Sequence, residues 1–486
     1  MTRTLRLLLP FVLVSVCFAQ DPADRVISEA LKPSTLESNL QRLTDQVGGR
    51  VPGTPAMQKA VDWGVEAFKA AGAPSVHTED FTIGASWAEG ATRMAVTSPE
   101  TFPTRAISLA WAPALAPQTH VPVVDVGNGT AADFEKAGSI AGAIVLIHTD
   151  EMKVWEDLFD EYLKAPAIID LAVKGKAMAI AFQSTRPHDL LYRHTNALSG
   201  EIDRLPMVLV AREDAARMAR LIAAGQKLYV DIAIPNRIGG SITASNVVAE
   251  LRGSEKPDEF VVLGAHLDSW ELGTGALDNG CNAALVVDAL RAIKSSGVPL
   301  RRSIRFILFS GEEEGMIGSH AYVHDHHSEL EKIAGVVVFD SGSGRTTGFS
   351  VGGRKDIVPA VTGLVSPLQQ FGANAITTDA EWGTDNWDFL LEGVPTLVAN
   401  QLEANYLLNY HAMSDTFDKV DMPQLKQHVA EAAALAVGLA NSSDRVGPRL
   451  HHAEIEQTMR ETHLDDIMKT FGMWQDWQTG KLGRSD

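Results

Sequence analysis

The stretch Phe260–Asn282, FVVLGAHLDSWELGTGALDNGCN, decides the fold. It begins as a short apolar run, which is typical of a buried strand, and the run ends at His266 and Asp268. A loop rich in Gly and Leu then delivers Asp278 and leads into a helical pattern at Asn282–Ser296. A strand that ends in His-x-Asp, followed by another Asp at the start of a helix, has the pattern of half a metal site. We therefore expect the other half at the ends of later strands.

Strand-like and helix-like segments alternate from Thr243 onward. The strand-like segments are nearly continuous apolar runs, as in sheets that are covered on both faces. This alternation predicts the α/β class, with a doubly wound sheet between two layers of helices. The predicted strands are Asn246–Leu251, Phe260–Gly264, Ser303–Phe309, Ile333–Phe339 and Pro395–Asn400, and the predicted helices are Asn282–Ser296, Met316–His326, Ile357–Phe371 and Gln424–Asn441.

Residues 119–235 have a different sequence pattern, with several short strand-like runs. This pattern predicts an inserted β-rich module with its own small core. The main α/β sheet would then be formed by residues 21–118 and 236–445, and a tail, 446–486, would pack on the body or on a partner. Within the module, Thr185–His194 gathers Arg, His and Tyr side chains. This cluster either reaches over a neighbouring cleft or is a solvated polar loop, and the solvated loop is the simpler interpretation.

Composition excludes several classes of function. The chain has 486 residues and a formal net charge of −19, whereas proteins that bind nucleic acids or anionic surfaces are usually basic. Residues 1–20 combine two Arg, an apolar run from Leu5 to Phe18 and a small Ala19, the pattern of a secretory signal. The run is short for a membrane anchor. We expect a secreted or periplasmic protein that has no membrane association after the signal is removed.

Four predicted strands present His or carboxylate side chains at the same end. Ligands of open α/β sheets bind beyond the carboxyl ends of the strands. Two imidazoles with several carboxylates suit Zn²⁺, and two zinc ions can share one bridging carboxylate, for which Asp278 is the natural candidate. The residues at these ends are His266 and Asp268, Glu312–Glu314, Asp340, and His411 with Asp415.

Neighbouring positions suggest separate roles. Asp268 is placed to accept the ring N–H of His266, and Asp415 could do the same for His411. Adjacent Glu312 and Glu313 cannot both point the same way, so one can bind metal while the other faces the substrate as a free carboxylate. Taken singly, each of these residues could be a structural His, a solvated acid or a helix cap; only their combination predicts a site. Cys281, alone once the signal is removed, is better explained as a small buried residue than as a nucleophile or ligand.

The motifs in this order resemble the di-zinc aminopeptidases of metallopeptidase family M-28. The likeness covers about residues 36–441, and its details are most similar to the plasma glutamate carboxypeptidase type within that family. The motifs are HLDSW at 266–270, ALDNG at 276–280, EEEGMIGS at 312–319, FDSG at 339–342, YHAMSDT at 410–416, DQVGGRVPGT at 45–54, and the GTD-x-x-x-F-x-x-x-GVP pattern at Gly383–Pro395.

The resemblance implies a fold and a role for each site residue. The fold would be the mixed sheet of zinc-dependent exopeptidases (phosphorylase/hydrolase-like), with a protease-associated domain as the insert. A cis peptide bond would follow the bridging aspartate. In the implied centre of two zinc ions, Asp278 bridges both metals, His266 and Asp340 complete one, Glu313 and His411 complete the other, Glu312 is the general base and Asp268 orients the site.

The implied activity is hydrolysis of dipeptides or short peptides with a free amino terminus, because clustered carboxylates could hold an α-ammonium group. Weaker candidates for substrate binding are Asp385, which Asn386 follows where many family members have His, and Tyr410. Tyr406, Tyr410, His188 and His194 are alternatives for stabilising the oxyanion. Relatives of this type imply a homodimer.

Two other classes on the same fold remain open. A glutaminyl-cyclase-type enzyme would use one zinc ion, and a transferrin-receptor-type binding protein would have lost ligands. Five intact ligands and Glu312 favour the hydrolase.

Overall fold

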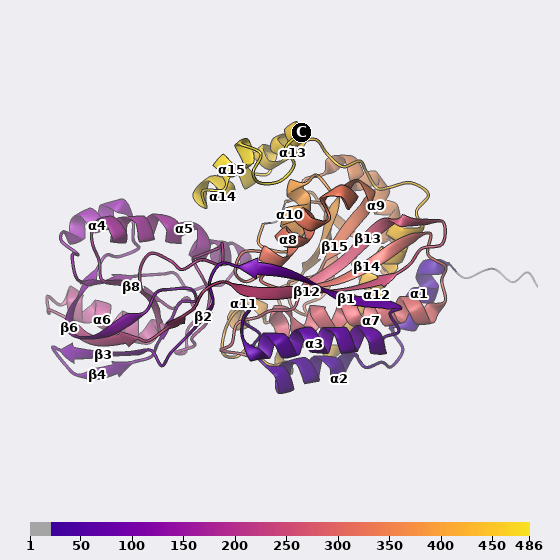
Figure 1. Ribbon diagram of the computed structural model, residues 1–486. Coiled ribbons are helices and arrows are strands. Elements are labelled where there is room, and N and C mark those ends of the chain that lie inside the picture. Colours follow the sequence, from indigo (N-terminus) through magenta and orange to yellow (C-terminus); the bar gives the residue numbers. More distant parts are fainter. Residues whose placement is uncertain (1–20, 381) are drawn as a thin grey trace, which may run out of the picture.

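The computed structural model describes residues 21–380 and 382–486. The secretory signal expected at residues 1–20 lies outside this range. Figure 1 shows a larger α/β part, a smaller part beside it, and C-terminal helices that lie across the top. Within the described ranges, no helix combines the length and the apolar character that a membrane span requires.

The larger part is built on an eight-stranded mixed sheet with the strand order β1-β12-β14-β13-β15-β18-β16-β17. The four central strands, β14, β13, β15 and β18, are parallel, and β12 joins them antiparallel. The predicted doubly wound mixed sheet is confirmed. Its strands are β1 (Ser75–Ile83), β12 (Ile242–Leu251), β13 (Lys256–His266), β14 (Arg302–Phe309), β15 (Ile333–Val338), β16 (Thr346–Ser350), β17 (Ala375–Thr377) and β18 (Thr396–Gln401).

Helices cover both faces of this sheet because successive strand side chains point in opposite directions. Val261 and Leu263 of β13 pack into the core beneath one helical layer, and Val262 packs into the core beneath the other. The first layer contains α1 (Pro22–Ala30), α2 (Leu36–Gln41), α3 (Pro55–Ala70), α7 (Cys281–Ser296), α9 (Val358–Val365) and α12 (Met422–Asn441); the second contains α8 (Ile317–Asp325) and α10 (Asn386–Leu391).

The smaller part has its own eight-stranded sheet, ordered β4-β3-β10-β6-β7-β8-β9-β5. Three helices and two separate cores accompany it. The elements are β3 (Arg93–Ser98), β4 (Phe102–Thr104), β5 (Ala106–Ser108), β6 (Leu115–Asp125), α4 (Ala131–Ala137), β7 (Ile144–Ile147), α5 (Trp155–Lys174), β8 (Ala179–Gln183), β9 (Met207–Val210), α6 (Arg212–Ala223) and β10 (Tyr229–Ile234). Two further short strands, β2 (Trp87–Ala88) and β11 (Arg237–Ile238), pair with each other in antiparallel orientation.

The chain leaves and rejoins the main sheet at one place. β1 and β12 pair antiparallel along their whole length, and the last pair is Ile83 with Ile242. Residues 84–241, here called the inserted module, therefore lie between two directly paired residues. The boundary expected from the sequence, residue 119, falls too late, because β3 to β5 pair within the second sheet.

The C-terminal tail packs on the body of the protein. Its helices are α13 (His452–Glu461), α14 (Leu464–Thr470) and α15 (Trp474–Gln478). Met459, Met468 and Trp477 share a core with Trp387 and Leu391 of α10. The ring of Phe471 stacks on Trp382, with 4.7 Å between the ring centroids. The tail thus supports a loop that, as shown below, lines the central pocket.

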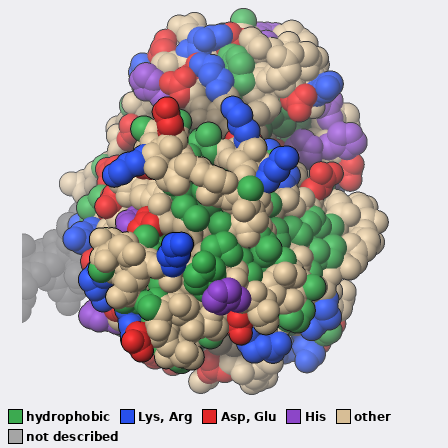
Figure 2. Space-filling model, turned by 90° about the vertical axis from the view of Figure 1, so that its left-hand side faces the viewer, with side chains coloured by type: hydrophobic (Ala, Val, Ile, Leu, Met, Phe, Trp, Pro, Cys, Tyr) green, Lys and Arg blue, Asp and Glu red, His purple; other side chains and the backbone are tan. Residues whose placement is uncertain are grey.

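Charge is mixed over the surface of the side occupied by the inserted module. In Figure 2, apolar side chains gather in the middle of this face, with Lys, Arg, Asp and Glu side chains around them. The net negative charge of the chain is therefore not concentrated there as a single acidic patch.

Candidate active site

The predicted site residues meet at the carboxyl ends of the central parallel strands. His266 is the last residue of β13, Glu312 and Glu313 follow β14, and Asp340 follows β15. Asp278 lies in the loop between β13 and α7, and His411 comes just after α11 (Tyr406–Asn409). All of these side chains line one pocket, as the rule for open α/β sheets predicts.

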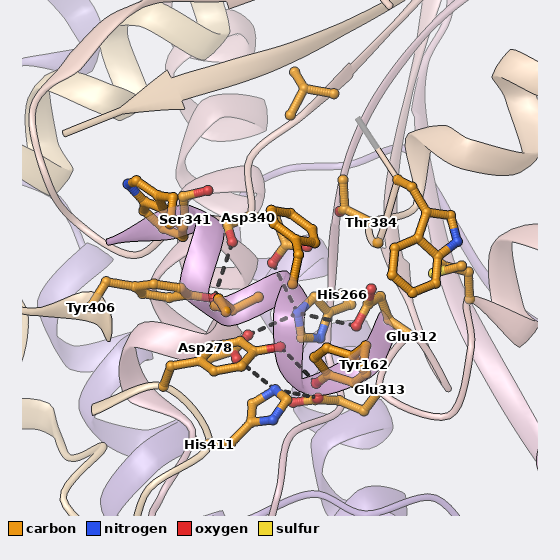
Figure 3. A pocket seen from close by; sticks show the side chains of 18 of the residues that line it. Tyr162, His266, Asp278, Glu312, Glu313, Asp340, Ser341, Thr384, Tyr406 and His411 are labelled. Carbon is orange, nitrogen blue, oxygen red and sulfur yellow. Dashed lines mark hydrogen bonds and ion pairs between the residues drawn. The ribbon is translucent and has the colours of Figure 1, made fainter. Parts of the chain in front are cut away.

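Asp278 lies between two separate groups of side chains. In the first, His266 Nε2 is 3.2 Å from Asp278 Oδ1 and 3.0 Å from Asp340 Oδ1. In the second, His411 Nε2 is 3.2 Å from Asp278 Oδ2 and 2.8 Å from Glu313 Oε2. Figure 3 shows the Asp278 carboxylate between the two imidazoles. One oxygen of Asp278 therefore serves each group, which is the arrangement of a bridging ligand.

The donor atoms fit metal binding. Nitrogen and oxygen ligands lie about 2.0–2.2 Å from Zn²⁺, so two ligand atoms of one tetrahedral ion are roughly 3.3 Å apart. The distances of 2.8–3.2 Å within each group are close to this value. Ligand atoms of His266, Asp278 and Glu313 all lie within 4.8 Å of one another. Imidazole and carboxylate donors are also the types that zinc accepts.

Burial and mutual attraction shift the pKa values of these groups strongly. Burial opposes charge on His411, but Glu313 and Asp278 outweigh it and raise the pKa of His411 to about 9. Burial raises the pKa of Glu313 to about 7, although His411 partly opposes this. Burial alone would raise the pKa of Asp278, but hydrogen bonds with both histidines lower it. These shifts reflect the burial of the cluster and the close contact between its imidazoles and carboxylates.

Glu312 is the carboxylate that stands apart. Its Oε2 is 3.9 Å from His266 Nε2, beyond hydrogen-bond distance, and the side chain lines the pocket. Burial raises the pKa of Glu312 well above its ordinary value, and the neighbouring carboxylates reinforce the shift. Both adjacent glutamates line the pocket, but Glu313 contacts His411 directly at 2.8 Å, whereas Glu312 is 3.9 Å from His266.

Two predicted supporting roles differ in detail. The main-chain oxygen of Asp268, not its carboxylate, is closest to His266 Nδ1, at 3.1 Å against 3.7 Å. The carboxylate of Asp268 instead accepts the N–H of Glu313 at 3.1 Å. Asp415 does not hold the ring of His411; its carboxylate accepts main-chain N–H groups of the loop at Asp278. Short acidic side chains here prefer main-chain donors, which spacing along the sequence does not reveal.

Arg50 is a supporting residue that the sequence did not single out. Its buried guanidinium donates to four main-chain oxygens, at distances of 2.6–2.9 Å. Three of these oxygens belong to Leu267, Thr274 and Gly275, which flank the loop leading to Asp278. The peptide bond between Asp278 and Asn279 is cis. The only signal for Arg50 was its place in the motif DQVGGRVPGT, which carried the family resemblance.

The pocket has a volume of about 370 Å³ and largely apolar walls. Tyr406 and Tyr410 line it, whereas His188 and His194 do not, which leaves the tyrosines as oxyanion candidates. Asp385 is fully buried and is not among the residues that line the pocket, although the neighbouring Thr384 is. Lining residues that the sequence did not point to include Trp155, Leu158, Phe159, Tyr162, Leu198, Met316, Trp382 and Thr384.

The missed residues come from the inserted module, from the tail-supported loop and from the segment after the three glutamates. On α5, Trp155, Leu158, Phe159 and Tyr162 recur at the three- and four-residue spacing of one helical face, and that spacing was the available signal. Cys281 is buried and free, and burial raises the pKa of its thiol well above its ordinary value. It is therefore a packing residue rather than a nucleophile.

Two histidines and two carboxylates around a central aspartate, with a further glutamate at a small pocket, have the pattern of a metallohydrolase. Comparison with known proteins specifies the class: residues 246–436 match Peptidase family M28. The chain therefore carries a Peptidase family M28 domain and is a metallopeptidase, which confirms the predicted enzyme class.

Similarity extends beyond that domain. The chain is 26% identical to mouse Carboxypeptidase Q over 451 residues, which are 88% of this chain and 91% of that protein. It is also 26% identical to a Peptidase M28 precursor from Shewanella amazonensis, whose crystal structure superimposes with a TM-score of 0.78 and covers 88% of this chain and 98% of that one. A zinc aminopeptidase from Bacillus subtilis, 20% identical, has the same fold with a TM-score of 0.63 over 82% and 93% of the two chains.

Proposed function

We propose that this protein is a zinc-dependent exopeptidase that removes the amino-terminal residue of dipeptides or short peptides. The observation that carries the proposal is the bridging position of Asp278, whose two oxygens each lie 3.2 Å from a different histidine. This arrangement has room for two ions that share one carboxylate. We assign His266 and Asp340 to one ion, and Glu313 and His411 to the other.

Zinc held by these residues would supply Lewis acidity, which polarises a peptide carbonyl and makes water easier to deprotonate. Glu312 is the general base: its carboxylate takes the proton of the attacking water and gives it to the departing amine. Burial raises the pKa of Glu312, which suits a group that must both accept and release a proton near neutral pH. Tyr410, whose hydroxyl is 3.0 Å from that of Tyr162, is the candidate hydroxyl donor to the developing oxyanion.

The charge of the pocket favours a free amino terminus over a free carboxylate. Glu312, Asp340 and Asp278 line it, and no Lys or Arg is found among its described lining residues. An enzyme that selects a substrate carboxylate normally presents a cation to it. The pocket therefore offers no protein cation to a substrate carboxylate, and Glu312, which is not assigned to a zinc ion, can accept a hydrogen bond from a substrate α-ammonium group.

The apolar walls of the pocket favour a substrate whose amino-terminal residue has a large apolar side chain. Trp155, Leu158 and Phe159 of α5, with Met316 and Trp382, form apolar surface beside the acidic end. A volume of about 370 Å³ is at the lower end of small-molecule sites, which range over about 300–1,000 Å³. We therefore propose dipeptides or short peptides with Leu, Met or Phe at the amino terminus as preferred substrates.

A panel of matched peptides tests this proposal. Leu-Ala, N-acetyl-Leu-Ala and Leu-Ala-amide should be assayed with the purified enzyme, before and after a chelator and after zinc is returned. We expect cleavage of the free peptide and the amide, no cleavage of the acetylated peptide, loss with chelator and recovery with zinc. Preferential cleavage of the acetylated peptide would contradict the proposal. Metal analysis should give two zinc ions per chain; one would favour a cyclase of the glutaminyl cyclase type.

We also propose three features of the mature protein. Residues 1–20 would direct export to a secreted or periplasmic location, the inserted module would correspond to a protease-associated domain, and the chain would form a homodimer. Amino-terminal sequencing of the exported protein and light scattering of the purified protein test the first and third.

A further inference from the structure

The loop that carries His411 is hydrogen-bonded to the inserted module rather than only to the catalytic part. The main-chain N–H of Arg193 donates to the His411 carbonyl at 2.9 Å. The N–H of Met413 donates to the carbonyl of Leu191 at 3.1 Å, and Tyr192 and Ala412 form an antiparallel bridge. A short piece of sheet pairing thus joins the two parts of the protein at a site ligand.

Arg186 adds a side-chain contact to the same loop. Its guanidinium is buried, donates through Nη2 to the Tyr410 carbonyl at 3.0 Å, and donates through Nη1 to Glu161 Oε1 at 3.0 Å. The guanidinium carbon lies 3.8 Å from the centroid of the Tyr192 ring, and the Tyr192 hydroxyl donates to Glu161 at 2.6 Å. Contacts with Glu161 and Tyr192 therefore fix Arg186 within the module, while its Nη2 bonds to the main chain of the residue before His411.

The ring of His411 lacks the usual support of a metal-binding histidine. Such rings generally donate their second N–H to an oxygen, as His266 Nδ1 can toward the Asp268 carbonyl at 3.1 Å. The buried Nδ1 of His411 has no hydrogen-bond partner among the described residues. The backbone of His411 has a φ of 58°, a left-handed conformation that a non-glycine residue adopts only where its surroundings hold it. The direction of this ring therefore depends on its main chain and on the ring of Tyr410, which stacks on it with 3.6 Å between the centroids.

We propose that Arg186 is a positioning residue for His411, and that the inserted module thereby controls metal affinity at the ligand pair Glu313 and His411. This inference rests on the proposed function, which takes these two residues as zinc ligands. Residues that orient a ligand typically change metal affinity by about 10–100-fold when they are replaced. The effect of Arg186 should fall on one of the two ions, because the ring of His266 has its own support.

The test uses Arg186→Lys in the full-length mature chain. Lysine retains the positive charge, but its single ammonium cannot satisfy both Glu161 and the Tyr410 carbonyl as the two arms of arginine do. The matched control is Arg212→Lys. Arg212 also belongs to the module and also donates to main-chain oxygens, but both of them, on Thr149 and Ser184, lie inside the module. Zinc retention is measured against increasing chelator, together with the visible spectrum of the cobalt-substituted protein.

We expect Arg186→Lys to release one zinc ion at a roughly tenfold or more lower chelator concentration than the wild type, while Arg212→Lys behaves as the wild type. The cobalt spectrum of Arg186→Lys should lose the same component that is lost in His411→Ala. Unchanged retention of both ions would overturn the inference. If Arg186→Lys does not fold, as judged by circular dichroism, Glu161→Gln weakens the same contact without removing the arginine. A wild-type protein that binds no zinc would instead refute the proposed function.

Discussion

The carboxylate of Asp415 holds the main chain of Asp278. Its Oδ2 accepts the N–H of Asp278 at 3.1 Å, and its Oδ1 accepts the preceding N–H of Leu277 at 2.7 Å. Burial raises the pKa of Asp415 to about 7, and the two main-chain donors partly oppose that shift. A carboxylate from the His411 loop thus determines where the bridging aspartate lies.

Replacing Asp415 by Asn should weaken binding of both metal ions. The amide has only one acceptor oxygen, so one of the two N–H groups would face an NH₂ group instead of an oxygen. We expect roughly 10–100-fold weaker zinc retention in a chelator titration. Asp421→Asn is the matched control, since Asp421 caps α12 by accepting the N–H of Gln424 at 3.0 Å, a role that Asn performs as well. Equal zinc retention by both variants would contradict the role of Asp415.

Substitutions of the adjacent Glu312 and Glu313 should have different effects, one on the chemical step and the other on metal binding. Glu312→Gln removes the group that moves the proton, and we expect kcat to fall by about 10²–10⁴-fold while zinc content stays at the wild-type level. Glu313→Gln, one residue away, should lose zinc as well as activity, because Glu313 Oε2 lies 2.8 Å from His411 Nε2. Metal analysis of both proteins beside their rates makes the comparison. Substantial activity in Glu312→Gln would exclude it as the base.

The tail should influence substrate preference through Trp382. Phe471 stacks on this pocket residue, so Phe471→Ala leaves one face of the indole unsupported. We expect KM for Leu-Ala or Phe-Ala to rise several-fold, with a much smaller change for Ala-Ala, which reaches less of the apolar wall. Trp474→Ala is a control in the same tail, where the ring faces Arg460 and Lys469 instead. A uniform change across substrates would argue against a role in side-chain selection.

Glu431 should make the protein less stable as pH rises. This carboxyl of α12 is buried, and burial raises its pKa to about 7; the Thr346 hydroxyl and the charge of Arg345 only partly offset the shift. Because the folded value exceeds the unfolded one, stability is retained below about pH 4.5 and lost as pH rises through about 7. At pH 8 the penalty is about 3 kcal/mol.

Glu431→Gln should therefore raise the free energy of unfolding at pH 8 and change it little at pH 5, measured by denaturant titration. Glu100→Gln, at an exposed position, serves as the control. A pH-independent difference between wild type and Glu431→Gln would contradict the assignment.

The sequence predicted those parts of the site that short-range patterns encode. His266 and Asp340 directly follow short apolar runs that are typical of buried strands, so the rule about strand ends predicted their position without a structure. The partners of Asp268 and Asp415 were not predictable in this way, because main-chain donors come from loops whose conformation depends on the whole fold. The same limit applied to Trp382, which is held in the pocket wall by Phe471 from the distant tail.

The inserted module illustrates the same limit at the level of domains. Its hydrophobic strands were visible, but β3 to β5 looked like edge strands of the first part and were assigned to the wrong sheet. Strand partners that are distant in sequence are set by cross-strand packing, which one sequence does not display. For that reason α5, with its aromatic face toward the pocket, was not expected to contribute to the site.

The direct pairing of Ile83 with Ile242 has a consequence for how such proteins diversify. The module is attached at the end of the antiparallel pair β1 and β12. Its size and sequence can therefore change without shifting the alignment of any strand in the catalytic sheet. Grafting a module from a relative onto these two anchor residues would exchange the aromatic wall above the substrate and the contacts to the His411 loop in a single step, while the strand alignment of the catalytic sheet stays as it is.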